Sequence, residues 1–121
     1  MRIVVTALGC VLLAGCAATV GEMEAAGPNR SFTSEKPVEA VADCIHLKWR
    51  DQTVAGTAHP VSVASTSAGT YVTVHDGKGA SEVARLRTEP GGLQIDYFQQ
   101  DYIFSDGWRP RMRIAAIESC L

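Results

Sequence analysis

Apolar positions in the middle of the chain first follow a helical repeat. Pro37 suits the first turn of a helix, and Glu39 adds favourable charge near its amino end. Ser34, three residues earlier, is a candidate cap. The pattern predicts an amphipathic helix over 36–49, with apolar residues at the three- and four-residue spacing of one helix face: Val38, Val41, Ala42, Ile45 and Trp49.

Beyond Thr53 the pattern changes to short runs in which apolar and polar residues alternate or β-branched residues cluster. Such runs are typical of strands when turn-forming residues separate them. The spacing predicts an antiparallel meander of about four strands. The predicted strands cover 61–64, 70–74, 82–87 and 93–98, and the turns lie at Ser67-Ala68-Gly69, Asp76-Gly77-Lys78-Gly79 and Glu89-Pro90-Gly91-Gly92.

The carboxyl-terminal segment fits two patterns. Residues 111–114 alternate as a strand would, whereas the apolar residues between Met112 and Leu121 also fit one face of a short helix. We favour the helix, because Pro110 suits its start. The expected fold is therefore α+β, with an antiparallel sheet of about four strands and an amino-terminal and a carboxyl-terminal helix on one face of the sheet.

An uncharged apolar run, Ile3–Leu13, follows Met1 and Arg2. Its length is typical of the hydrophobic region of a signal peptide and too short to span a bilayer. The run closes in Leu13-Ala14-Gly15-Cys16, which resembles the lipobox of bacterial lipoproteins. The resemblance implies that residues 1–15 are removed and that Cys16, acylated on its thiol, becomes the first residue. It further implies an outer-membrane anchor facing the periplasm, because Ala17 stands where Asp would favour the inner membrane.

The sequence divides into three parts on this interpretation. Residues 1–15 form the signal peptide, and 34–121 form the small α+β domain. Between them, 16–33 is the lipidated amino terminus and a flexible tether, since 17–30 is rich in Ala, Gly and Glu and has no helical apolar repeat.

Two cysteines remain once Cys16 is modified. Exported proteins meet an oxidising compartment, so Cys44 and Cys120 are expected to form a disulfide that closes almost the whole domain. A metal site or a reactive thiol is the alternative, since His46 lies near Cys44. A Cys-x-His pair alone falls short of a tetrahedral zinc set.

Charge and motifs narrow the function classes. From Cys16 onward the chain carries ten Lys and Arg against thirteen Asp and Glu, a formal charge of −3. Without a basic run, nucleic acid is not expected as a partner. The sequence has no phosphate-binding loop, and its three His residues lack metal-ligand spacing, so we expect no cofactor and no metal.

Aromatic residues concentrate between Tyr97 and Trp108 among polar neighbours. Such side chains suit binding surfaces, and core packing is the alternative. Nearby carboxylates would need to face one another across a cleft to hydrolyse a glycoside. The candidate binding residues are Tyr97, Tyr102, Phe104 and Trp108, and the carboxylates are Asp96, Asp101 and Asp106.

Three arginines follow directly, Arg109, Arg111 and Arg113. They would share one face of a strand but spread around a helix. We expect them to be solvated, and contact with lipid headgroups or a polymer is the alternative.

The leading functional expectation is a membrane-anchored envelope lipoprotein, a small non-enzymatic interaction module. Its expected partners are the lipid bilayer, through acylated Cys16, and an envelope protein or polymer. A module that binds a sugar polymer or peptide through residues 97–108 is one alternative. A small hydrolase with carboxylates distant in sequence is the other.

Overall fold

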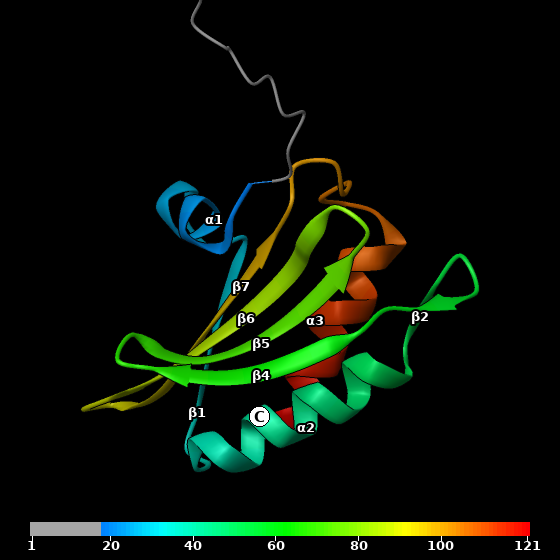
Figure 1. Cartoon of the computed structure of the whole chain (residues 1–121). Helices are drawn as coiled ribbons and strands as arrows, with labels where there is room; N and C mark the ends of the chain where they lie inside the picture. The colour runs from blue at the N-terminus through cyan, green and yellow to red at the C-terminus, as the bar shows by residue number, and fades with distance from the viewer. Residues whose placement is uncertain (1–17) are drawn as a thin grey trace, which may run out of the picture.

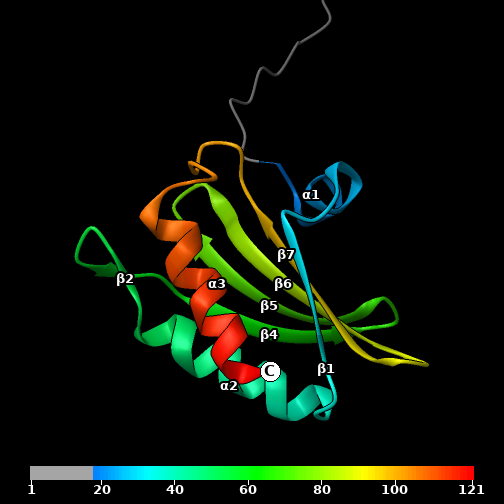
Figure 2. The same cartoon turned by 180° about the vertical axis from the view of Figure 1, so that it is seen from behind.

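The computed structural model describes residues 18–121, which form a five-stranded antiparallel sheet between helices (Figure 1). The predicted signal peptide and Cys16 lie outside the described residues. Helices α2 and α3 cover one face of the sheet, and the short helix α1 packs on the other (Figures 1 and 2). The helices are α1 (Val20–Ala26), α2 (Val38–Asp51) and α3 (Trp108–Cys120).

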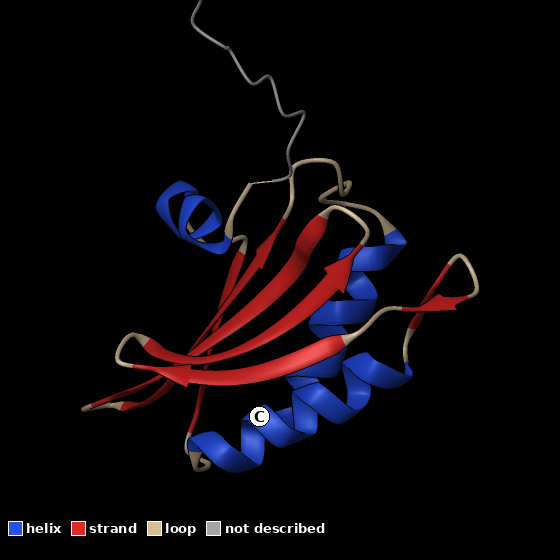
Figure 3. Ribbon diagram, viewed as in Figure 1, coloured by secondary structure: helices blue, strands red, loops and turns tan. Residues whose placement is uncertain are grey.

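The sheet has the strand order β1-β7-β6-β5-β4, in which the last four strands form a meander joined by tight turns (Figure 3). This confirms the predicted α+β fold and its antiparallel sheet. The meander strands are β4 (Val61–Thr66), β5 (Gly69–Asp76), β6 (Gly79–Glu89) and β7 (Gly92–Gln99); the edge strand is β1 (Arg30–Ser34), and a separate small hairpin comprises β2 (Thr53–Val54) and β3 (Thr57–Ala58).

The main core lies between the sheet and helices α2 and α3. Val41, Ile45 and Trp49 of α2 are fully buried, as the helical repeat predicts. They pack with the apolar residues that alternate on β5, β6 and β7, because every second side chain of a strand faces the same way. The Trp49 indole N–H donates to the backbone oxygen of Arg113, 3.1 Å away, and so links the two helices.

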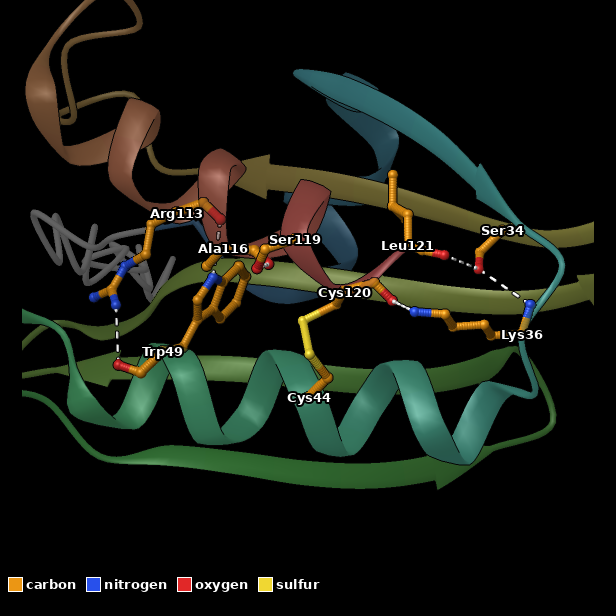
Figure 4. The surroundings of a disulfide bond; sticks show 9 residues. All are labelled: Ser34, Lys36, Cys44, Trp49, Arg113, Ala116, Ser119, Cys120 and Leu121. Atoms are coloured by element: carbon orange, nitrogen blue, oxygen red, sulfur yellow. Dashed lines mark hydrogen bonds between the residues drawn. A yellow bond between two sulfur atoms is a disulfide. The ribbon is translucent and has the colours of Figure 1, made fainter.

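A disulfide between Cys44 and Cys120 joins α2 to α3, as predicted (Figure 4). The end of the chain is also held by Lys36, whose Nζ donates to the Cys120 carbonyl at 3.4 Å. Ser34 does not cap α2, which begins after Pro37 without a side-chain cap. The Ser34 hydroxyl instead accepts a hydrogen bond from the Lys36 amide and donates one to the Leu121 carbonyl.

The structure corrects the predicted tether. The segment before residue 34 contains helix α1 and strand β1, and β1 pairs with β7 throughout its length. Helix α1 is capped by Thr19, whose hydroxyl accepts the Glu22 amide. Its one buried side chain, Met23, packs against the open face of the sheet at Val83 and Phe98. The folded domain therefore includes residue 18.

Candidate functional site

Exposed aromatic side chains gather where the chain passes from β7 into α3. Tyr102 is 39 % exposed, Phe104 81 % and Trp108 53 %. We call these three residues the aromatic patch. Ile103, between two of them, is buried and fixes the loop to the domain. Three of the four aromatic residues predicted as a binding surface are therefore exposed.

Tyr97 is the exception and corrects the prediction. It lies on β7 and is fully buried beneath the helices. Its ring meets Trp49 edge-on, with centroids 6.2 Å apart. Tyr97 belongs to the core because it shares the inward face of β7 with Leu93 and Ile95.

The aromatic patch surrounds a shallow hollow of about 210 Å³. Val54 of the small β2–β3 hairpin also lines it, together with Ile103, Gly107, Arg109 and Pro110. No pattern in the sequence indicated Val54, because the hairpin has only two residues in each strand. In the part of the chain that the structure describes, no carboxylate lines this hollow.

Polar contacts fix Tyr102 within the patch. Its hydroxyl donates to Asp76, and the Lys78 ammonium lies 4.6 Å from the centre of its ring, as in a cation–π contact. Burial and the hydrogen bond to Asp76 raise the pKa of Tyr102 well above its ordinary value. Burial also raises the pKa of Asp76, but the Tyr102 hydroxyl and the Lys78 amide outweigh it and lower that pKa overall. At neutral pH Tyr102 is therefore a neutral phenol that donates a hydrogen bond to the ionised carboxylate of Asp76.

A buried carboxylate holds the first turns of α3 beneath the patch. Glu82 of β6 is fully buried and accepts hydrogen bonds from Arg109 and from Arg113, whose Nε lies 3.4 Å away. Arg113 also donates to the Trp49 carbonyl and to Gln52. The expectation that the arginine cluster is solvated is wrong for Arg109 and Arg113, whereas Arg111 is exposed.

A second charged cluster attaches α1 to the open face of the sheet. Arg85 of β6 bridges Glu24 at 2.6 Å and Asp96 at 2.8 Å. Burial raises the pKa of Asp96, but hydrogen bonds from Arg85, Ser31 and Gln94 outweigh it and hold that pKa below its ordinary value. Asp96 is therefore ionised at neutral pH and unsuited to act as a general acid.

The other predicted carboxylates, Asp101 and Asp106, are exposed in the loop before α3. The structure thus places Asp96 in the sheet and these two acids at the surface. Within residues 18–121, no three His, Cys, Asp or Glu side chains are grouped to hold a metal ion. The described part also contains no helix long and apolar enough to cross a membrane.

The amino-terminal end of the described chain lies beside the loop that carries the patch (Figures 1 and 2). The Ala18 amide donates to the side-chain oxygen of Gln100 at 3.1 Å, and the Gln100 amide donates back to the Ala18 carbonyl. Gln100 is itself buried and also donates to the Ala80 carbonyl at 2.8 Å. These bonds fix the start of the domain at the same end of the sheet as the aromatic patch.

No protein-family model matches the chain, and comparison with curated proteins and with solved structures found no match.

Proposed function

We propose that this protein is a bacterial envelope lipoprotein, held in the membrane by acylated Cys16, whose domain is a non-enzymatic interaction module. The observation that carries the proposal is the uncharged run ending in Leu13-Ala14-Gly15-Cys16. The disulfide between Cys44 and Cys120 supports it, because such bonds persist in oxidising compartments. Ala17, next to the anchor, favours the outer membrane with the domain facing the periplasm.

The aromatic patch supports an interaction role. Large apolar side chains exposed together mark contact surfaces more often than isolated ones do. The hollow beside them, about 210 Å³, is smaller than the roughly 300 to 1,000 Å³ of a typical small-molecule site. We therefore assign the patch to contact with a surface rather than to enclosure of a substrate.

A second candidate is binding of a sugar polymer or peptide by the same rings. The observation that favours it is the arrangement of Tyr102, Phe104 and Trp108 around one hollow. Hydrolysis is less well supported, because the carboxylate of Asp96 is engaged by Arg85 and Arg87.

The anchor is tested by intact mass of protein extracted from membranes. We expect a chain that begins at Cys16 and carries added acyl groups. Cys16→Ser should block acylation and processing because it removes the modified thiol. Cys10→Ser is the matched control, since Cys10 lies in the segment removed and its loss should leave the mature mass unchanged. A mature chain that begins elsewhere and bears no lipid would refute the proposal.

A further inference from the structure

We infer that the surface contacted by the aromatic patch is the lipid bilayer, with Tyr102, Phe104 and Trp108 seated in its headgroup layer. The inference rests on the proposed anchor at Cys16 and names the partner of the patch.

The connection between the proposed anchor and the domain is short. One residue, Ala17, separates Cys16 from Ala18. Two peptide units reach at most about 7 Å, so the Cα of Cys16 lies within that distance of the Cα of Ala18. Acyl chains on Cys16 hold this residue at headgroup depth. Ala18 is fixed to the domain by Gln100, so the domain has no slack with which to move away from the bilayer.

The patch and Ala18 are held by the same turn of the chain. Gln100, which holds Ala18, begins the turn that carries Tyr102. The Ile103 amide donates to the Gln100 carbonyl at 3.0 Å, and the Gln99 side chain donates to the Ile103 carbonyl at 3.1 Å. Ala18 and the patch are thus held by the same turn at one end of the domain. A bilayer that receives the acyl chains meets this end first.

The exposed side chains of the patch are of the kinds that suit a membrane surface. Trp and Tyr favour the membrane–water interface, because their rings are apolar and their N–H or O–H groups keep polar partners there. The Tyr102 hydroxyl has such a partner in Asp76. Phe104 is 81 % exposed to water, which suits a ring that enters the acyl boundary. Charges at this end are of both signs. Lys78 and Asp76, at the β5–β6 turn, contact Tyr102, and Arg109 lines the hollow, while Asp101 and Asp106 are exposed in the β7–α3 loop. The contact is therefore made by the rings and does not need anionic lipid.

Contact between the patch and lipid can be measured from the fluorescence of Trp108. The lipidated full-length protein is reconstituted in phosphatidylcholine vesicles with or without chain-brominated phosphatidylcholine, which quenches fluorescence on contact. We expect at least twofold quenching of the Trp108 emission, unchanged by 0.5 M salt. Trp49 is fully buried in the core and supplies the unquenched background, so Trp108→Phe should abolish the response.

Phe104→Ser tests the patch without disturbing the core, because the ring is exposed. It should reduce quenching of Trp108 at least twofold while acylation and melting temperature stay unchanged. Leu47→Ser is the matched control: Leu47 is 49 % exposed on α2 and does not line the hollow, so its loss should not alter quenching.

The inference is overturned if the acylated protein shows no more quenching of Trp108 than of Trp49, or if Phe104→Ser quenches as the parent does. A Trp108 emission that ignores brominated lipid but shifts with soluble peptidoglycan fragments would assign the patch to a polymer instead. These outcomes leave the lipoprotein proposal intact. Absence of acyl groups in the intact mass would refute that proposal separately.

Discussion

At the scale of single residues, Glu82 connects the core to the aromatic patch. Its carboxylate lies on β6 with no exposed surface and is shared by Arg109 and Arg113. A buried charge is costly unless ionic and hydrogen-bonding partners surround it. Because Arg109 is adjacent to Trp108, the same carboxylate also orients the first turn of α3 and hence one ring of the patch.

Glu82→Gln should therefore lower the free energy of unfolding by about 3 to 5 kcal/mol, since it leaves Arg113 buried without its counter-charge. Urea denaturation followed by circular dichroism measures this. Glu118→Gln is the control, because its pairing with Arg30 at 3.6 Å is more than half exposed and is worth at most about 1 kcal/mol. Equal losses in the two variants would contradict a special role for the buried cluster.

At the scale of elements, the helices and strands with many buried residues could be predicted from the sequence, whereas the elements with few buried residues could not. Helix α2 was predictable because its repeat places Val41, Ile45 and Trp49 in the core. The core face of α3 includes Arg113, a charged residue at an apolar position, and this explains why its pattern also fitted a strand. Helix α1 gave no repeat, because in seven residues it buries Met23 alone. Strand β1 has only five residues and one aromatic, Phe32. Its own sequence therefore does not predict a strand or the pairing with β7.

The site was predictable to a similar degree. Aromatic density identified Tyr102, Phe104 and Trp108, but it could not separate them from Tyr97. Leu93, Ile95 and Tyr97 lie on the same face of β7, because every second side chain of a strand faces the same way. This register, rather than the density of aromatic residues, decides that Tyr97 is buried. The contribution of Val54 required the three-dimensional structure, because its hairpin is remote in sequence from the loop.

The docking of helix α1 on the sheet depends on Met23. Met23→Ala should undock α1 from the sheet, because it removes the one buried side chain of that helix. Hydrogen exchange should then show loss of protection in residues 20–26 with the amides of β6 and β7 still protected. Ala25→Gln, an exposed position of the same helix, should leave exchange unchanged. Loss of protection throughout the sheet would show instead that α1 belongs to the global folding unit.

At the scale of the whole molecule, the position of Ala18 decides which end of the domain would face a membrane that holds Cys16. Ala18 and the β7–α3 loop lie at one end of the sheet, and the turn between β4 and β5 lies at the other. A lipid anchor at Cys16 would therefore turn the end of the sheet that carries the aromatic patch toward the membrane. In the proposed lipoprotein, the short connection between Cys16 and Ala18 would fix this orientation, since a long one would permit any orientation.

Lengthening the connection should release the domain from this orientation. Fifteen Gly and Ser residues inserted between Ala17 and Ala18 would add a coil with an end-to-end distance of roughly 20 Å. We expect quenching of Trp108 by brominated lipid to fall at least twofold, with acylation and melting temperature unchanged. The same insertion between Ser67 and Ala68, in the distant β4–β5 turn, lengthens the chain equally and should leave quenching as in the parent. Undiminished quenching after the first insertion would mean that the rings hold the domain on the bilayer by their own affinity, and that the short connection does not set the orientation.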